Sequence, residues 1–314
     1  MSKKAATRTA FGQALAELGG QNPSVVALDA DLLRSTMSVF FAQKHPERFF
    51  EMGIAEQDMF STAAGLAAGG KIVFANTFAV FAAGRACDQI RQQVALPRLN
   101  VKVCGSSAGI TQGPDGATHQ SVADVAIMRA LPNMTVIVPA DEVETKKAVF
   151  AAADHEGPVY LRLGRWEVPS IFEDDYGFQI GKAAVMRQGT DVTICANGTL
   201  LFIALEAAGR LGNEGISAAV LNVHTVKPLD EETILAFASK TGAVVTAEEH
   251  SIIGGLGGAV AELLSEKAPT PLRRVGIRDV FGQSGTADEL MEKYGLSGGG
   301  IVEAVHEVLK LKRS

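Results

Sequence analysis

The chain alternates between short apolar runs rich in β-branched residues and longer amphipathic stretches rich in alanine. Runs of the first kind are typical of buried strands, stretches of the second kind are typical of helices, and their alternation predicts an α/β fold with a largely parallel sheet. In the first half we expect strands at 24–28, 71–75, 100–104, 135–138 and 159–163. We expect helices there at 9–18, 36–44, 58–68, 78–95, 122–130 and 141–153.

This alternation stops between about residue 166 and residue 188, where Pro169, an acidic cluster at 173–175 and Gly177 occur. Such residues disfavour regular elements, so the segment reads as a connection between domains. The alternation then resumes, with strands expected at 192–196, 217–221 and 243–247 and helices at 200–211, 231–239, 259–266 and 301–311. The pattern therefore predicts two doubly wound domains with mainly parallel sheets, at 1–170 and 191–314, joined by a linker at 171–190.

Composition narrows the class of protein. The 314 residues are 47% hydrophobic and 20% charged, which is enough apolar material for two full cores. A net charge of −6 argues against nucleic acid or an anionic membrane as the main partner. The three cysteines are far apart, no apolar run reaches about 18 residues, and no signal peptide is apparent. We therefore expect a soluble cytoplasmic protein, and the six histidines show no spacing typical of a protein metal site.

Glu56 is the most unusual residue of the first half. It lies between apolar and small residues and begins a stretch, 58–68, that is too apolar to be a solvated helix face. A buried carboxylate must be paired, protonated or in contact with a ligand, because burying it alone costs several kcal/mol. Glu56 is therefore a candidate functional acid.

The segment 113–120 is a second candidate. It is rich in glycine and carries Asp115 and His119, which could bind a substrate hydroxyl and a phosphate or move a proton. The alternative is an Asp-Gly turn with a capping histidine. Its position after an expected buried strand favours a site, because loops at strand ends commonly carry ligand contacts.

Further residues are ambiguous when they are taken singly. Phe78 and Phe81 are three positions apart and could pack in the core or stack on a flat heteroaromatic ring. Arg8, Arg162 and Arg165 are ordinary surface candidates that could also bind a phosphate.

Taken in chain order, these segments resemble the pyrimidine-binding half of transketolase. The resemblance rests on Gly53-Ile-Ala-Glu-Gln57, Thr77-Phe78, the run Gly113-Pro-Asp-Gly-Ala-Thr-His-Gln120, Leu131-Pro-Asn133 and Pro139-Ala-Asp141. It continues into the second domain through 244–250 and covers nearly the whole chain. Deoxyxylulose-phosphate synthase and the β subunits of pyruvate-dehydrogenase-type decarboxylases share this architecture, and the Asp-Gly-x-Thr-His-Gln core matches the transketolase and synthase branch better.

The resemblance implies a thiamine-diphosphate-dependent transferase of the pentose phosphate pathway. In that family the glutamate matching Glu56 protonates the aminopyrimidine ring of the cofactor, and a two-carbon ketol unit passes from a ketose to an aldose. The chain lacks the Gly-Asp-Gly and Asn element that holds the metal and the diphosphate. The resemblance therefore implies the C-terminal subunit of a split transketolase. We expect it to be active only with an N-terminal subunit that holds Mg²⁺ or Ca²⁺, as two copies of each chain.

The resemblance also assigns the remaining site residues. Glu56 and His119 correspond to catalytic residues. The expected cofactor contacts are Asp31, Ile54, Glu56, Phe78 and Phe81; the expected sugar-phosphate contacts are Arg8, Ser35, Asp115, His119 and Arg165. Two positions depart from the family, since Ser107 stands where transketolases have a histidine and Gly84 where a third aromatic residue is expected. The donor and acceptor sugars stay open for that reason.

Two other functions compete with this one. One is half of a synthase or the β subunit of a 2-oxoacid decarboxylase or dehydrogenase, which a lipoyl-domain partner or carbon dioxide release would support. The other is a non-catalytic partner that keeps the fold. The presence of Glu56, Asp115 and His119 argues against the latter, because a scaffold needs none of them.

Overall fold

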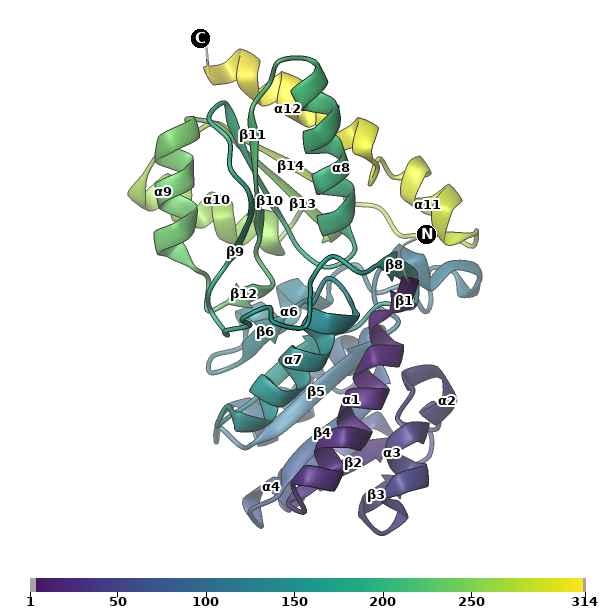
Figure 1. Cartoon of the computed structure of the whole chain (residues 1–314). Helices are drawn as coiled ribbons and strands as arrows, with labels where there is room; N and C mark the ends of the chain where they lie inside the picture. Colours follow the sequence, from purple (N-terminus) through teal and green to yellow (C-terminus); the bar gives the residue numbers. More distant parts are fainter. Residues whose placement is uncertain (1–3, 313–314) are drawn as a thin grey trace.

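The computed structural model describes residues 4–312, which form two α/β domains, one above the other in Figure 1. The lower domain contains a seven-stranded sheet with the strand order β12-β6-β7-β5-β4-β2-β3. Its strands are β2 (Val25–Asp29), β3 (Phe49–Glu51), β4 (Ile72–Phe78), β5 (Val101–Ser106), β6 (Thr135–Ile137), β7 (Val159–Arg162) and β12 (Thr225–Lys227). All neighbouring strands are parallel except β12 and β6.

Helices cover both faces of this sheet. One face carries α1 (Thr7–Gln21), α2 (Leu33–Thr36), α3 (Val39–Lys44) and α7 (Glu142–Asp154). The other carries α4 (Glu56–Ala68), the π-helices η2 (Phe81–Arg85) and η3 (Ile90–Ala95), the short α5 (Cys87–Gln89) and α6 (Asp124–Ala130). Phe11 and Phe41 pack against the first face, and Met59 and Ile90 against the second. Two apolar cores on opposite faces make this a doubly wound sheet.

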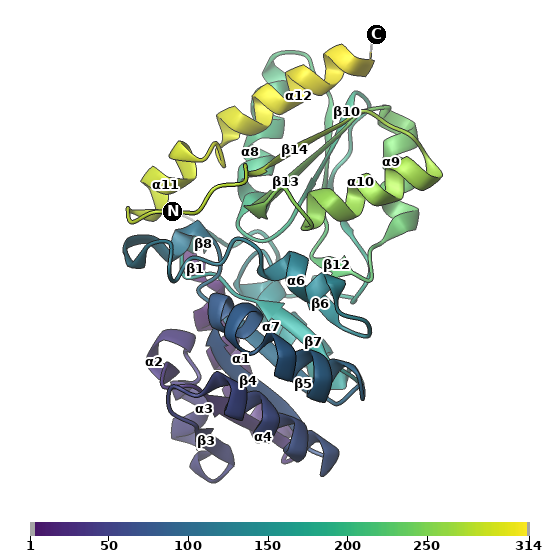
Figure 2. The same ribbon diagram turned by 180° about the vertical axis from the view of Figure 1, so that it is seen from behind.

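The upper domain repeats this design around a five-stranded sheet with the order β14-β13-β10-β11-β9. Its strands are β9 (Ala184–Arg187), β10 (Val192–Ala196), β11 (Ala218–Asn222), β13 (Val244–Ser251) and β14 (Leu272–Ile277), with only β9 antiparallel to its neighbour. Its helices are α8 (Leu200–Asn213), α9 (Glu231–Thr241), α10 (Leu256–Lys267), α11 (Ala287–Lys293) and α12 (Gly298–Lys312). Figures 1 and 2 show α8 and α12 on one face and α9 and α10 on the other.

Three short features join the domains. Strand β12 comes from the second half of the chain but pairs with β6 of the lower sheet, and Lys227 Nζ donates to the Arg129 carbonyl at 2.9 Å. A two-stranded sheet pairs β1 (Lys4–Ala6) with β8 (Glu167–Pro169). The 3-10 helix η4 (Ile110–Asp115) of the lower domain packs against α11 of the upper one. A second 3-10 helix, η1 (Pro46–Arg48), lies within the lower domain.

The predicted fold class, two domains with mainly parallel sheets, is confirmed. The interval 171–190, expected to be a linker, contains β9, which pairs with β11 of the upper sheet. The elements β1, β3, β8, β12, β14 and α11 were not foreseen. Most of them are short or lie at sheet edges, where the hydrophobic pattern is weak.

Two expected helices differ in the structure. The helix expected at 36–44 is two helices, because the Thr36 and Ser38 hydroxyls both donate to the Asp29 carboxylate while Met37 adopts a left-handed φ of 66°. The helix expected at 78–95 begins later, because Phe78 is the last residue of β4 and pairs with Ser106 of β5. Its remainder is a π-helix, a short α-helix and a second π-helix. π-helical turns are rare and frequently lie at functional sites.

Candidate active site

The predicted site residues gather at the carboxyl ends of β4 and β5, where ligands bind in open α/β sheets. Strand β4 ends at Phe78 and strand β5 at Ser106. The segment 110–120, called here the substrate loop, follows β5 and carries Asp115 and His119. The loop begins with η4 and ends at the buried Gln120, shortly before α6 begins at Asp124.

Three aromatic rings form one side of the site. The rings of Phe78 and Phe81 are stacked, with centroids 5.8 Å apart and an interplanar angle of 21°. The imidazole of His119 meets both edge-on, at 6.1 Å from Phe78 and 5.5 Å from Phe81. The sequence predicted that both phenylalanines lie on one helix. In the structure Phe78 ends β4 and Phe81 begins η2, but their rings still stack and form one aromatic wall.

Glu56 lies beside this wall. It is the first residue of α4, and its side chain is 1% exposed. Its partner is Arg85 at the end of η2, whose Nη1 donates to both carboxylate oxygens at 3.0 Å. The guanidinium of Arg85 also lies over the Phe81 ring, 4.7 Å from its centroid, and 48% of its side chain is exposed. Of the three options for a buried acid, the structure therefore shows the pair, and the partner of Glu56 is half exposed.

A second, polar group lies on the other side of the substrate loop. Arg8 Nη1 donates to the Ser35 carbonyl at 2.8 Å, and Arg165 Nη1 donates to Asp115 Oδ2 at 3.2 Å. Gln112 donates to the same Asp115 oxygen at 2.5 Å. Burial, and secondly the positive charge of Arg165, lower the pKa of Arg8. Two facing guanidinium groups, with a buried Arg8 Nε that has no partner, form a place that favours an anion.

Arg165 and Arg162, the two arginines considered for the phosphate, differ in their partners and in their exposure. Arg162 is 7% exposed, and its Nε donates to Asp124 Oδ2 at 2.7 Å. Its Nη2 donates to the carbonyls of Ser121 and Glu249. Burial acts to lower the pKa of Arg162, but the Asp124 carboxylate outweighs it and raises that pKa. Arg162 is therefore bound within the protein, and the partly exposed Arg165 is the arginine that faces Asp115.

Asp31 and Ile54 lie at the rim. Asp31 is exposed, adopts a left-handed φ of 60°, and its N–H donates to Glu51 Oε1 at 2.7 Å. Ile54 is an exposed apolar residue two positions before Glu56. Ser107, where the family has histidine, is fully buried and its hydroxyl has no partner. A side chain at Gly84 would meet nothing within 4 Å, so the missing aromatic residue leaves open space there.

Several contributing residues were not predicted from the sequence. Arg85 had no signal, although it pairs with Glu56. Gln112 and Gln120 were not identified either, because a buried glutamine in a loop has no distinctive sequence pattern. Asp29 is buried behind the site and accepts from Thr36 and Ser38, and burial raises its pKa to about 6. The hydrogen bonds that Asp29 accepts shape the turn on which Asp31 and Ser35 lie.

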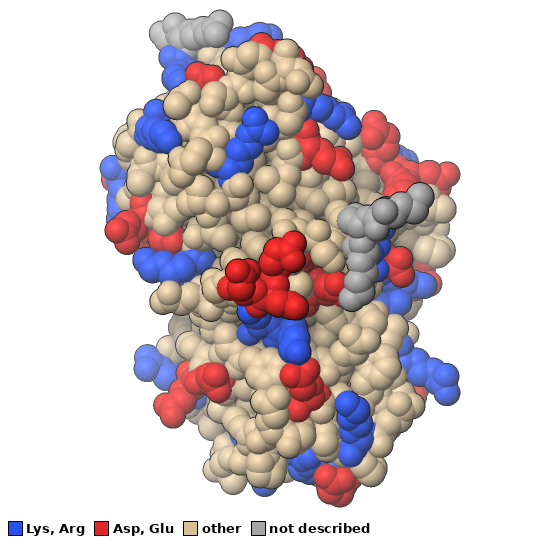
Figure 3. Space-filling model, viewed as in Figure 1, with Lys and Arg blue, Asp and Glu red and all other residues tan. Residues whose placement is uncertain are grey.

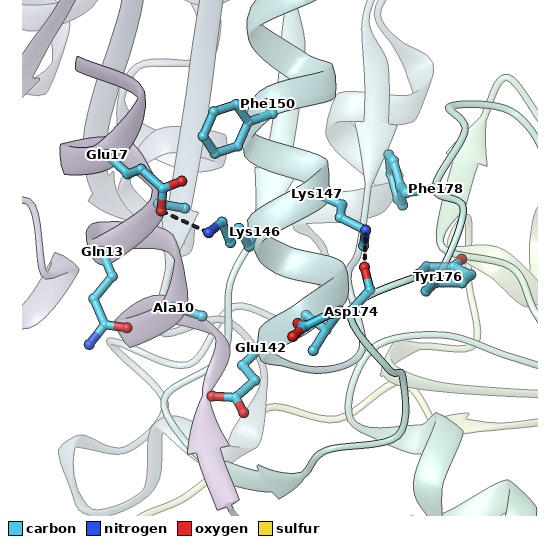
Figure 4. A pocket seen from close by; sticks show the side chains of 12 residues that line it. Ala10, Gln13, Glu17, Glu142, Lys146, Lys147, Phe150, Asp174, Tyr176 and Phe178 are labelled. Atoms are coloured by element: carbon cyan, nitrogen blue, oxygen red, sulfur yellow. Dashed lines mark hydrogen bonds and ion pairs between the residues drawn. The ribbon is translucent and has the colours of Figure 1, made fainter. Parts of the chain in front are cut away.

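A larger groove lies elsewhere, between α1 and α7 (Figure 4), with a volume of about 650 Å³. Its charged groups are already paired, because Lys146 binds Glu17 at 2.8 Å and Lys147 donates to the Asp174 carbonyl at 2.7 Å. Figure 3 shows acidic side chains gathered where the two domains meet, at the level of this groove. It lies on the α1 and α7 face of the sheet, and its aromatic lining residues, Phe150, Tyr176 and Phe178, are not among the predicted site residues. It is therefore not the candidate active site.

Two features are absent from residues 4–312. Within this range, no group of three or more His, Cys, Asp or Glu side chains is placed to hold a metal ion. None of the helices in the described part of the chain is long and apolar enough to cross a membrane.

Comparison with known proteins identifies families and relatives that match both domains. Residues 3–170 match the transketolase pyrimidine-binding domain, and residues 181–301 match the transketolase C-terminal domain. A 6-deoxy-6-sulfo-D-fructose transketolase subunit from Clostridium sp. (strain MSTE9) is 49% identical over 97% of this chain and 95% of its own length. An apulose-4-phosphate transketolase subunit from Phocaeicola vulgatus is 41% identical over 97% of this chain and 98% of its own length.

A solved structure described as a split gene transketolase, inactive beta4 tetramer, is also similar. It is 54% identical, with a TM-score of 0.92 over 98% of this chain and 99% of that one. Both family domains, in the same order and over most of the length, show that this chain belongs to the transketolase family.

Proposed function

We propose that the chain is the pyrimidine-binding subunit of a split, thiamine-diphosphate-dependent transketolase that moves a two-carbon ketol unit between sugar phosphates. One observation carries the proposal: a buried glutamate, Glu56, lies beside a wall of stacked aromatic rings and has a counter-ion, Arg85, that is 48% exposed. A structural carboxylate is normally satisfied by fixed donors. An acid whose partner can swing away remains available to a ligand.

The residues present fit the pyrimidine end of the cofactor. Phe78 and Phe81 offer an aromatic surface for a flat ring, and Glu56 lies next to them as an acid that can hold a proton against a ring nitrogen. When bound, thiamine diphosphate supplies the electron sink for cleaving the carbon–carbon bond of the ketose. Glu56 would hold a proton at a ring nitrogen of the bound cofactor, and the half-exposed Arg85 would give up the carboxylate to that ring.

The polar group fits the substrate. Arg8 and Arg165 bind its anionic end, Ser35 lies beside Arg8, and Asp115 accepts a hydrogen bond from a sugar hydroxyl. His119 is close enough to the aromatic wall to donate to the oxygen atoms of the reacting carbons. The names of two relatives, a sulfo-sugar and a phospho-sugar transketolase subunit, both describe sugars with an anionic group, which supports this use of the two arginines.

A partner chain completes the enzyme in this proposal. It supplies the diphosphate-binding domain with its Mg²⁺ or Ca²⁺, and two copies of each chain form the active assembly. The exposed Ile54 next to Glu56 suits a contact that becomes buried on association. The similar structure described as an inactive tetramer of beta chains supports the need for a different partner.

Reconstitution tests the proposal. The chain is purified alone and with its diphosphate-binding partner, and ketol transfer from xylulose 5-phosphate to ribose 5-phosphate is measured. We expect transfer only from the mixture, and only with thiamine diphosphate and a divalent ion. Transfer by this chain alone would contradict the split-subunit part. Carbon dioxide release from pyruvate, without ketol transfer, would favour a decarboxylase instead.

A further inference from the structure

The substrate loop is fastened at both ends by the C-terminal domain. Near its start, the Glu249 carboxylate accepts from the Thr111 N–H and from the Thr199 hydroxyl, each at 2.8 Å. At its end, Gln120 Nε2 donates to the Gln283 carbonyl at 2.9 Å. Glu249 belongs to β13, and Gln283 lies between β14 and α11. In Figure 2 the stretch between these two elements runs down to the level of β8.

Gln120 is the more informative of the two contacts. Its side chain is 4% exposed, and Nε2 also donates to the carbonyls of Ile110 at 3.2 Å and Gly113 at 3.1 Å. The amide nitrogen carries two N–H groups, so one of them is shared between two of the three carbonyls. Because carbonyl oxygens only accept, the three groups fix the orientation of the amide. One side chain therefore ties the first turn of the substrate loop, the loop's own end and the C-terminal domain together.

The backbone is fitted closely around these two side chains. A Cβ on Gly109, whose φ is 78°, would lie 2.0 Å from Glu249 Oε1. A Cβ on Gly282 would lie 1.8 Å from Gln120 Oε1. Glycine at both positions lets the buried polar side chains approach the backbone, which larger residues would prevent.

Between these two ties lie the residues that act on the substrate. Asp115 and His119 are both in the substrate loop, and neither is held by a regular strand or a long helix. A displacement of about 1 Å in such groups commonly costs up to about 100-fold in rate. The precision of the site therefore depends on what holds the loop.

We propose that the C-terminal domain is a positioning element of the active site, and that Gln120 is the positioning residue through which it sets Asp115 and His119. The proposal rests on the proposed function for its catalytic readout. It assigns the second domain a task in the reaction, although none of the predicted site residues lies in that domain. Gln120 itself contacts only backbone carbonyls.

Two single variants, one in each domain, test the contact between Gln120 and the segment that contains Gly282 and Gln283. Gln120→Ala removes the amide, and Gly282→Ala displaces it without changing residue 120. In the assembled enzyme we expect each to lower kcat/KM for the ketose donor roughly 10- to 100-fold. The affinity for thiamine diphosphate should change less than about twofold, because Glu56, Phe78 and Phe81 are untouched. Gly209→Ala is the matched control, since its Cβ would meet nothing within 4 Å.

The double variant distinguishes positioning from general damage. Once Gln120 is truncated, the Cβ of Gly282→Ala has no amide to displace, so the double variant should be no slower than Gln120→Ala alone. Additive losses would overturn the proposal. Unchanged kcat/KM for Gln120→Ala in enzyme that is folded at the assay temperature would also overturn it.

Hydrogen exchange on the chain by itself separates this proposal from the proposed function. In Gln120→Ala and Gly282→Ala, amides at 110–119 should exchange at least tenfold faster, while those of β4 and β5 keep their rates. If wild-type enzyme transfers no ketol unit, the proposed function fails, and the exchange result still decides whether the C-terminal domain holds the loop. Unchanged exchange at 110–119 would contradict it.

Discussion

Two buried carboxylates in this chain each bind one arginine, and the difference between the two pairs separates function from structure. In the Asp124–Arg162 pair the acid is 0% and the arginine 7% exposed, and Tyr160 also donates to Asp124 at 2.7 Å. In the Glu56–Arg85 pair the acid is 1% but the arginine 48% exposed. Both acids are out of water. Only Glu56 has a partner that can leave without opening the core.

The surroundings of the two pairs differ in the same way as their exposure. Arg162 reaches the Glu249 carbonyl at 2.8 Å and so joins the two domains. Burial acts to raise the pKa of Asp124, but Arg162, His250 and the Tyr160 hydroxyl together outweigh this effect and lower it, so the acid stays charged. Arg85 lies instead over the exposed side of Phe81 at the end of a π-helix. A buried acid with a fixed set of donors is structural here, and one with a movable donor is a candidate for chemistry.

The largest effect is expected at the movable pair, on activity. Glu56→Gln keeps the size of the side chain but cannot exchange a proton, so kcat of the reconstituted enzyme should fall on the order of 10²–10⁴-fold. Urea unfolding of the chain should shift little by comparison. Full activity of Glu56→Gln or Glu56→Ala in the assembled enzyme would sink the proposed mechanism. Gln57→Ala, at an exposed neighbouring position, is the control.

The fixed pair should show the opposite behaviour. Arg162→Met leaves the Asp124 charge buried without its partner, and the free energy of unfolding should fall by about 3–5 kcal/mol. The double variant Arg162→Met/Asp124→Leu removes the unpaired charge and should recover at least half of that loss. Urea unfolding followed by circular dichroism measures both. If the single variant lost less than about 1 kcal/mol, the pair would not be the structural element described here.

The polar group of the site gives an intermediate effect. Arg165→Met removes one of two cations facing the expected anion, and a hydrogen bond to a charged group contributes about 1.5–3 kcal/mol, so KM for a phosphorylated donor should rise about 10- to 100-fold. A donor without an anionic group should show little change, which makes it the internal control. An equal rise in KM for both kinds of donor would mean that Arg165 holds Asp115 and does not bind the substrate.

Much of the fold could be predicted from the sequence, because its long elements have clear periods. Glu56 could be identified because an acid in an apolar helix is unusual in itself. Arg85 could not, because it is the last residue of a π-helix whose side-chain directions differ from those of the expected α-helix. Phe78 and Phe81 illustrate the same difficulty: the expected helix was wrong at its start, and the stacking of the two rings on each other was not predicted.

The contacts that hold the substrate loop are even harder to predict from the sequence. Gln120 and Gln283 are far apart in the chain and meet only when the two domains dock. Their contact uses a backbone carbonyl, which has no residue-specific signal. The resemblance assigned Arg165, and not Arg162, to the sugar phosphate without a physical reason. The structure favours the same choice for a physical reason, because Arg162 is fully engaged with Asp124 and two carbonyls.

The smallest effect should come from Arg85, and it is the sharpest test of the comparison. Arg85→Met removes the partner of a buried acid, as Arg162→Met does. Because Arg85 is half exposed, water can reach the Glu56 carboxylate once the guanidinium is gone, and the free energy of unfolding should fall by less than about 1 kcal/mol. The same urea experiment measures both variants side by side. A loss close to that of Arg162→Met would place Glu56 among the structural acids, since its pair would then stabilise the fold as strongly as the buried one.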